Sequence, residues 1–179
     1  AIFDTLRATG TKATLFLGGK WMASHADRTR QLMADPLFEL ANHGYAHRNL
    51  RLLSGAALAQ EIEAPQRIYE AARDGLAARQ CLPPGAHVAQ RLSLFRFPYG
   101  ACNPQALQAV NAAGLVAVQW DLSTGDPSPA TSAQAITAAM SRARPGSIII
   151  AHANGRGYHT AEALPRAIAG LKAKGYEFV

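Results

Sequence analysis

"KATLFLGGKWMASHADRTRQLMADPLFELAN", residues 12–42, begins with an apolar run that ends at Gly18-Gly19 and closes with a second apolar run that ends at Asn42. Short apolar runs bounded by Gly, Pro, Asn or Asp are typical of buried β-strands. Residues 20–34, between the two runs, have a helical pattern. A strand, a helix and a second strand in this order favour two parallel strands joined by a crossover helix.

The same alternation of strand and helix continues along the rest of the chain. Further strands are predicted at residues 94–100, 115–121, 147–155 and 176–179, and further helices at 55–79, 104–113, 130–143 and 161–174. Residues 79–91 contain Pro-Pro-Gly and are interpreted as an insertion-like loop. Because no repeat or linker is evident, we predict one α/β domain over residues 1–179, either a barrel or a doubly wound sheet.

Composition indicates a globular protein. Of the 179 residues, 49% are hydrophobic and 17% are charged, and no apolar run approaches the ~20 residues of a membrane helix. The net charge is +6, but the basic residues are scattered and lack interleaved aromatic residues, which does not favour nucleic-acid binding. A basic surface suits anionic cell-envelope material equally well.

Cys81 and Cys102 lack the CxxC spacing of thiol zinc sites and redox pairs. They either pair with each other or are two small buried residues. The sequence starts at Ala1 rather than at Met, so the lack of a visible signal peptide carries no information.

Polar side chains gather where the predicted strands end. His43 and His47 follow strand 37–42, Arg96 to Gly100 close strand 94–100, and His152 lies at the end of the apolar run of strand 147–155. Asp121 and Asp126 are placed after strand 115–121. In α/β folds the carboxyl ends of the strands are where sites are built, so this set is the candidate site.

Each of these residues also has a purely structural explanation. His43 and His47 reach one metal ion if the chain turns helically after Gly44, but an isolated HxxxH also fits two solvated or capping histidines. His152 also fits a core histidine that is bonded to a backbone carbonyl. Arg96 lies among apolar neighbours, so we expect an acidic partner for it.

Asp121 and Asp126 also fit helix-capping and turn residues. His25 and His87 are predicted to be surface residues, and His159 is a candidate for the rim of the site.

Three motifs resemble the polysaccharide deacetylases, that is, the NodB-homology or carbohydrate esterase family 4 domain. "NHGYAH" resembles the family's metal-binding histidine motif, "RFPYG" its Arg-x-Pro-Tyr-Gly motif and "IIIAH" its late apolar-x-His motif. The motifs occur in the family's order and spacing, and the similarity covers nearly the whole chain. The resemblance implies a distorted (β/α) barrel of the NodB-homology type with mainly parallel strands.

The resemblance also implies roles for individual residues. His43 and His47 are expected to bind a divalent metal, most simply zinc, with cobalt and nickel as alternatives. Tyr99 is expected to hold the oxyanion through its backbone N–H, and His152 to protonate the leaving amine. Arg96 is expected to orient the catalytic base. Asp126, or less favourably Asp121, is expected to support the cationic form of His152.

Two departures from the family affect these expectations. The family's first strand ends in Thr-Phe-Asp-Asp and provides the base and the third metal ligand, whereas this sequence begins at "AIFDTLRATG". We therefore expect both groups to come from an N-terminal segment outside this chain, and Asp4 is assigned neither role. The family's last helix is also expected beyond "GYEFV". Ser123 and Pro127 stand where the family more often has Asp and Trp.

The resemblance implies an enzyme that removes acetyl groups from the nitrogen or oxygen of an acetylated polysaccharide or amino sugar. Two alternatives are a C–N hydrolase acting on a small amide or imide, and an inactive relative that only binds carbohydrate. The expected location is periplasmic or secreted. No nucleic-acid partner and no membrane span are expected.

Overall fold

The computed structural model describes residues 1–78 and 88–179, so most of the predicted insertion-like loop lies outside the described residues. Contacts within the chain define two compact units. One unit consists of Ala1–Ala13 and Trp120–Val179, and the other of Thr14–Gln119. The assignment of residues 1–179 to one catalytic domain stays a prediction.

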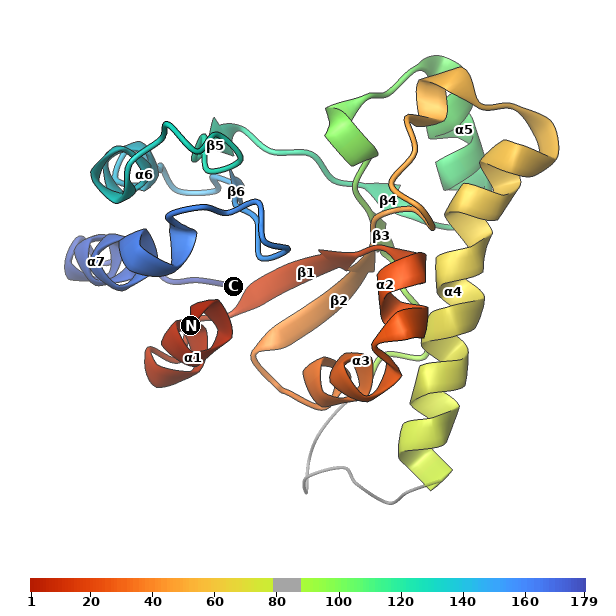
Figure 1. Ribbon diagram of the computed structural model, residues 1–179, viewed down its shortest axis with the longest axis horizontal. Helices are drawn as coiled ribbons and strands as arrows, with labels where there is room; N and C mark the ends of the chain where they lie inside the picture. Colours follow the sequence, from red (N-terminus) through yellow and green to blue (C-terminus); the bar gives the residue numbers. More distant parts are fainter. Residues whose placement is uncertain (79–87) are drawn as a thin grey trace. The chain divides into compact units, whose positions relative to one another are not determined.

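A four-stranded sheet forms the centre of the Thr14–Gln119 unit. Its order is β1 (Ala13–Leu17), β2 (Phe38–Asn42), β3 (Leu94–Phe95) and β4 (Val116–Ala117) (Figure 1). β3 runs parallel to both β2 and β4, as the alternation of strand and helix predicts. β3 is shorter than the predicted strand 94–100, because the chain reaches Pro98, which has no N–H to donate to a ladder.

The helices of this unit are α2 (Gly19–Ser24), α3 (Ala26–Met33), α4 (Gly55–Ala78) and α5 (Pro104–Ala112), with 3-10 turns η1 (Leu50–Leu52) and η2 (Pro98–Gly100). α4 contacts both α2 and α3 (Figure 1). The prediction of a single helix over 20–34 is wrong, because the backbone leaves helical geometry at His25, with φ −127° and ψ 49°. α5 begins as predicted, with Pro104 in its first turn and the Asn103 side chain accepting from the Ala106 N–H at 2.8 Å.

The core of this unit is packed around β3. Phe95 and Phe97 are 0% and 1% exposed, and their rings meet edge to face with centroids 5.1 Å apart. Apolar side chains of η1, α4 and α5 surround them: Leu50, Leu58, Ile62, Ala106 and Val110. This packing fixes the ends of the strands from which the candidate site residues project.

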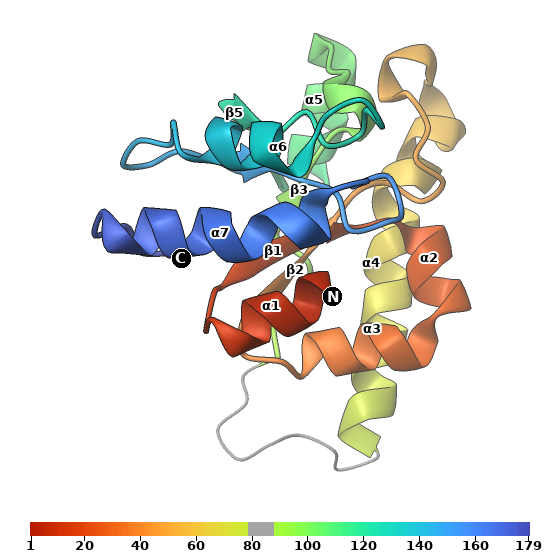
Figure 2. The ribbon, with the colours of Figure 1, turned by 60° about the vertical axis from the view of Figure 1, so that its left-hand side comes forward.

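The other unit contains α1 (Ile2–Ala8), β5 (Leu122–Ser123), α6 (Ala133–Met140), β6 (Ile149–Ile150) and α7 (Thr160–Ala173). β5 and β6 pair in parallel, and α7 packs against both α6 and α1 (Figure 2). β5 was not predicted. Asp121 therefore precedes a strand and Asp126 follows it, whereas both were expected to follow strand 115–121.

The predicted strand at 176–179 is wrong, because the chain there ends α7 instead of joining a sheet. The Tyr176 N–H donates to Leu171 O at 3.2 Å and the Gly175 N–H to Lys172 O at 2.9 Å, with Gly175 at φ +84°. These two bonds and the left-handed glycine form a Schellman cap. The apolar run therefore follows a helix end.

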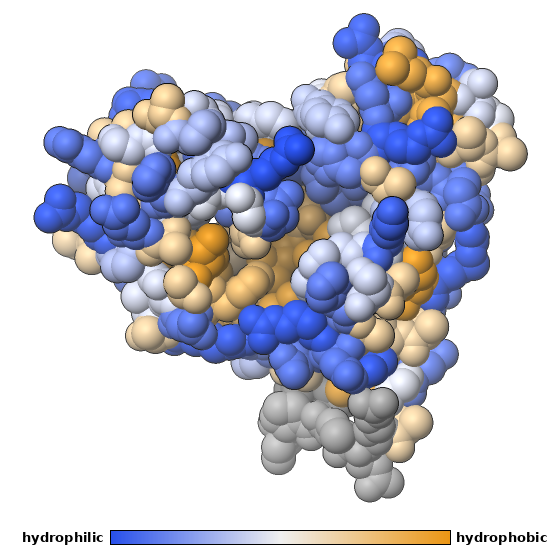
Figure 3. Space-filling view, viewed as in Figure 1, coloured by the Kyte–Doolittle hydropathy of each residue, from blue (hydrophilic) through white to orange (hydrophobic). Residues whose placement is uncertain are grey.

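Hydrophilic side chains cover most of the face shown in Figure 3. Apolar groups are also present on this face. The side chain of Leu52, in η1, is 81% exposed. In the described ranges, no helix combines the length and apolar character that a bilayer crossing requires.

Candidate functional site

His43 and His47 lie in a loop after β2, and their rings approach each other. The ring centroids are 4.9 Å apart and the ring planes meet at 77°. The explanation by a helical turn is wrong, because residues 43–49 contain no helix. The loop folds back through two left-handed residues instead, Gly44 at φ +76° and His47 at φ +56°.

The orientation of the His43 ring suits a metal ligand. Its Nδ1 lies 2.7 Å from the backbone oxygen of Arg96, and because a carbonyl only accepts, Nδ1 carries the proton. The lone pair is then on Nε2. Metal-ligating histidines generally donate their other ring N–H in this way, to a carbonyl or a carboxylate. The His47 ring is held by an edge contact with Tyr99, with centroids 4.6 Å apart.

Together, the two imidazoles fit half of a tetrahedral set of nitrogen and oxygen ligands for a divalent ion. Among residues 1–78 and 88–179, no cluster of three His, Cys, Asp or Glu side chains forms. The third ligand stays a prediction.

Arg96 follows β3 and is only 8% exposed. Its Nε donates to Val118 O at 3.1 Å, its Nη2 to Gln119 O at 3.0 Å, and its guanidinium lies 4.0 Å from the centroid of the Phe16 ring. Burial lowers the pKa of Arg96 to about 10, which keeps the side chain charged at neutral pH. The backbone carbonyls therefore fix the position of a buried cation. The predicted acidic partner stays a prediction.

Tyr99 has an unusual backbone for a bulky residue, with φ +61°, and its side chain is 67% exposed. Left-handed geometry at such a residue costs roughly 1–3 kcal/mol, and such strain is concentrated at functional sites. In the part of the chain that the structure describes, no backbone or side-chain acceptor receives the Tyr99 N–H. The donor expected to hold an oxyanion is therefore not used by the fold.

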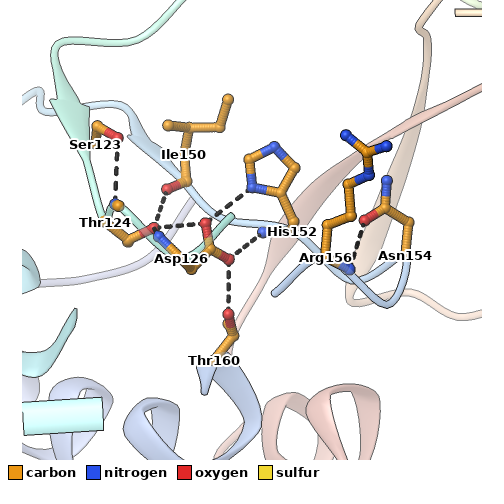
Figure 4. A network of polar contacts seen from close by, with 9 residues as sticks. Ser123, Thr124, Asp126, Ile150, His152, Asn154, Arg156 and Thr160 are labelled. Carbon is orange, nitrogen blue, oxygen red and sulfur yellow. Dashed lines mark hydrogen bonds and ion pairs between the residues drawn. The ribbon is translucent and has the colours of Figure 1, made fainter. Parts of the chain in front are cut away.

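In the other unit, Asp126 and His152 form the predicted pair (Figure 4). Asp126 is 1% exposed; its Oδ1 lies 2.8 Å from His152 Nδ1 and its Oδ2 accepts from the His152 N–H at 2.7 Å. An ionised carboxylate only accepts, so it fixes the proton on Nδ1. This leaves Nε2 of His152 to exchange protons with a substrate. Asp121 instead accepts from Ser147 Oγ and the Ile148 N–H.

Two threonines complete the hydrogen bonds to Asp126 (Figure 4). Thr160 Oγ1 donates to Oδ2 at 2.6 Å, and Thr124 Oγ1 donates to Oδ1 at 2.9 Å. Gly157 packs closely against the same residues, since a Cβ there would lie 2.5 Å from Thr160 Oγ1 and still closer to His152 O. Only glycine fits this position. The sequence analysis missed these three residues, although a Thr two residues before Asp126 and a Gly shortly after His152 are local signals.

Glu61 and Asn42 were not predicted as site residues either. They are 2% and 0% exposed, and their side chains accept hydrogen bonds from the backbone N–H groups of residues 44–46. A signal existed for Glu61, because it lies three residues after Leu58 and one before Ile62, beside the apolar stripe of α4.

The remaining predicted residues make other contacts or lie outside the described residues. His25 is exposed and stacks on Trp21, as expected for a surface residue. His159 lies at the start of α7, 3.7 Å from Glu162. Cys102 is exposed. Cys81 and His87 lie outside the described residues, so the pairing of the two cysteines stays a prediction.

The Asp126 network predicts a loss of stability in acid. Burial raises the pKa of Asp126, but the hydrogen bonds from His152, Thr160 and Thr124 together lower it below its usual value. A lowered folded-state pKa contributes stability above the unfolded value of about 3.9, and this contribution disappears as pH falls through the folded pKa. Asp126→Asn should therefore destabilise the protein at pH 7 by about 1–3 kcal/mol. The reason is that one carboxylate oxygen, which now accepts hydrogen bonds, is replaced by an NH₂ group that cannot accept them.

Urea unfolding between pH 3 and pH 7 measures this effect. The difference between wild type and Asp126→Asn should shrink steadily below about pH 4. Glu162→Gln is the matched control, because Glu162 lies in the same unit, its side chain is 74% exposed, and its loss should change stability little. If the stability difference between wild type and Asp126→Asn were the same at pH 3 and pH 7, the lowered pKa of Asp126 would be contradicted.

Comparisons with known proteins show the family to which this chain is similar. The family model described as polysaccharide deacetylase matches residues 1–118. A chitooligosaccharide deacetylase of Azorhizobium caulinodans is 29% identical over 154 residues, which are 85% of this chain and 65% of that protein. The chain thus spans just under two thirds of the length of this relative.

Two solved structures are also similar. A family 4 carbohydrate esterase from Streptomyces lividans, solved with acetate, superposes with a TM-score of 0.80 at 29% identity, over 98% of this chain and 81% of that chain. A pseudoenzyme of the same family from Bacillus anthracis gives a TM-score of 0.81 at 24% identity, over 99% of this chain and 56% of that chain. The second likeness concerns the fold alone.

Proposed function

Because this chain belongs to the polysaccharide deacetylase family, we propose that it removes acetyl groups from an acetylated polysaccharide or amino sugar in a reaction that depends on a divalent metal. Zinc is the first candidate metal, and cobalt and nickel are alternatives. A periplasmic or secreted location is part of the same proposal.

The observation that carries the proposal is the approach of His43 and His47. Two imidazoles with centroids 4.9 Å apart, one of them fixed through Nδ1 by a backbone carbonyl, support a role as metal ligands. When bound there, a divalent ion would polarise the acetyl carbonyl and lower the pKa of a water molecule. A third ligand and a general base from residues outside this chain complete the proposal.

His152 would supply the proton that the leaving amine needs. Asp126 holds Nδ1–H of its ring, so Nε2 is the atom that would donate. The pair works in the same way for an amide or an ester. The geometry therefore leaves the choice between nitrogen and oxygen open.

Tyr99 and Arg96 would each interact with a negatively charged group of the reaction. The Tyr99 N–H would donate to the carbonyl oxygen as negative charge develops on it, a type of contact whose removal typically costs ~10²- to 10³-fold in kcat. Arg96 would hold the carboxylate that acts as general base, because its guanidinium is already fixed by two carbonyls and needs no rearrangement.

Acetate release from defined substrates tests the proposal. The full-length protein that contains this chain is assayed on an N-acetylated chitooligosaccharide, an O-acetylated xylan and a small amide. Each assay is run on three forms of the protein. These are the protein as purified, the protein after a chelator has removed its metal, and the stripped protein after zinc, cobalt or nickel is added back. Acetate release from a carbohydrate should fall to background without metal and return with it.

Other results would contradict the proposal in distinguishable ways. An unchanged rate without metal would exclude metal dependence. Hydrolysis of the small amide alone would favour the C–N hydrolase. Carbohydrate binding without acetate release, in the presence of each metal, would favour a binding protein.

A further inference from the structure

The backbone N–H groups of residues 43–46, between the two histidines, all donate hydrogen bonds. We call residues 43–47 the histidine loop. The His43 N–H donates to Leu17 O at 3.0 Å, and the Gly44 N–H donates to Asn42 Oδ1 at 2.9 Å. The N–H groups of Tyr45 and Ala46 both donate to Glu61 Oε2, each at 3.0 Å. No N–H from residue 43 to residue 46 therefore relies on water.

The carbonyl side of the same loop is held by the start of α2. The Gly19 N–H donates to Gly44 O and the Lys20 N–H to Tyr45 O, each at 2.9 Å. The approach is close, since a Cβ on Gly19 would lie 2.9 Å from the Tyr45 ring and 3.1 Å from Pro65 of α4. The loop is thus bonded to α2 through its carbonyls and to α4 through its amides.

Glu61 is an unusual residue for this position on α4. It is 2% exposed, and within residues 1–78 and 88–179 its carboxylate forms no ion pair. Burying a carboxylate without a countercharge is costly unless hydrogen bonds compensate. Here the carboxylate accepts hydrogen bonds from two consecutive amides of the histidine loop, and these bonds offset the cost of burying it. A buried carboxylate that is bonded in this way fits a role in fixing that loop.

Gly44 and Asn42 show how tightly the carboxylate and the loop fit. A Cβ on Gly44 would lie 3.1 Å from Glu61 Oε2, so the turn leaves little room for a side chain. The Asn42 side chain links the same elements, because its Nδ2 donates to Ile62 O of α4 at 2.8 Å while its Oδ1 accepts from Gly44. α4 therefore holds the loop at two adjacent residues, Glu61 and Ile62.

We propose that Glu61 is a positioning residue that sets the relative placement of His43 and His47 before metal binds, and that its negative charge also favours a cation there. The inference rests on the proposed function for the identity of the ligand, a divalent cation. The loop geometry on which it stands lies wholly within the Thr14–Gln119 unit. Glu61 acts through the loop, because its carboxylate accepts from the Tyr45 and Ala46 N–H groups.

The test uses the full-length protein with Glu61→Ala, Glu61→Gln and the matched control Glu63→Ala. Glu63 is on the same helix, is exposed and forms an ion pair with Arg67. Zinc affinity is measured by competition with a chromophoric chelator. Hydrogen exchange of the Tyr45 and Ala46 amides is measured in metal-free protein, with the thermal midpoint as a check on folding.

Glu61→Ala should weaken zinc binding ~10- to 100-fold, the range typical for loss of an outer-shell partner, and should expose both amides to exchange. Glu61→Gln keeps an acceptor oxygen and should recover most of the protection and part of the affinity. Glu63→Ala should match wild type in both measurements.

Three results would overturn the inference. The first is unchanged zinc affinity and amide protection in Glu61→Ala. The second is a uniform loss of protection along the chain together with a lower thermal midpoint, which would mean general destabilisation. The third is no recovery in Glu61→Gln although it folds normally. A wild-type protein that binds no zinc would instead overturn the metal site of the proposed function, while the exchange data would still decide whether Glu61 holds the loop.

Discussion

Replacing His152 with alanine is expected to lower kcat for deacetylation by ~10²- to 10⁴-fold, the contribution typical of a general acid. The physical reason is the fixed proton on Nδ1, which leaves Nε2 as the donor to the leaving group. Zinc content should not change, because the ring is not one of the proposed ligands. The measurements are kcat on an N-acetylated oligosaccharide and zinc per protein.

Two comparisons separate proton donation from a structural role of His152. An aryl acetate with a good leaving group needs no acid, so the variant should lose much less activity on it. His152→Asn keeps a donor near Nδ1 for Asp126 but has no Nε2, so it should lose as much kcat as alanine while remaining stable. His25→Ala is the control, because His25 is an exposed histidine with no proposed role. Equal losses on both substrates would mean that His152 does not act as the acid.

Replacing either His43 or His47 with alanine is expected to abolish stoichiometric zinc binding and to reduce acetate release to background. Each removes one of the two nitrogen ligands in this chain, so the affinity should fall by more than the ~10- to 100-fold expected for an outer-shell residue. The double variant should be no worse in activity than either single one, because groups that act as a unit are not additive. Zinc titration of the full-length protein and acetate release measure this.

His25→Ala is the control for this experiment, since His25 is exposed and stacks on Trp21 in the same unit as the two histidines. It should bind zinc like wild type. Wild-type zinc affinity in either His43→Ala or His47→Ala would contradict the metal site, whatever the activity of that variant.

The order of elements could be predicted from the sequence because it depends on local pattern. Apolar runs and helical periodicity located β1, β2, α4, α5 and α7 within a few residues. The family was also evident, because short motifs such as "RFPYG" fix both residue type and backbone shape. The lengths of β3 and β6 were overestimated, because the apolar run in the sequence continues past the residues at which the neighbouring strands stop pairing.

Two choices that the sequence left open depend on distances through space. Asp121 and Asp126 both fitted the role of partner for His152. In the structure the Asp126 carboxylate is hydrogen-bonded to Nδ1 of the His152 ring, whereas the Asp121 carboxylate accepts from the Ser147 hydroxyl. The Arg96 guanidinium donates to the backbone oxygens of Val118 and Gln119, and the carboxylate expected beside it stays a prediction. Carbonyls are present at every residue, so no sequence pattern indicates which ones a guanidinium will meet.

By itself, the sequence determined the α/β alternation, the membership of the family and the residue types that carry its chemistry, because these follow from local periodicity and short motifs. Only the tertiary structure decided how His43 and His47 meet. Their spacing of four suggested a helical turn, yet a buried carboxylate on α4, 14 residues beyond His47, and the first amides of α2 hold them in a non-helical loop. Such a loop is stabilised by partners distant in sequence, and these come together only when the core packs.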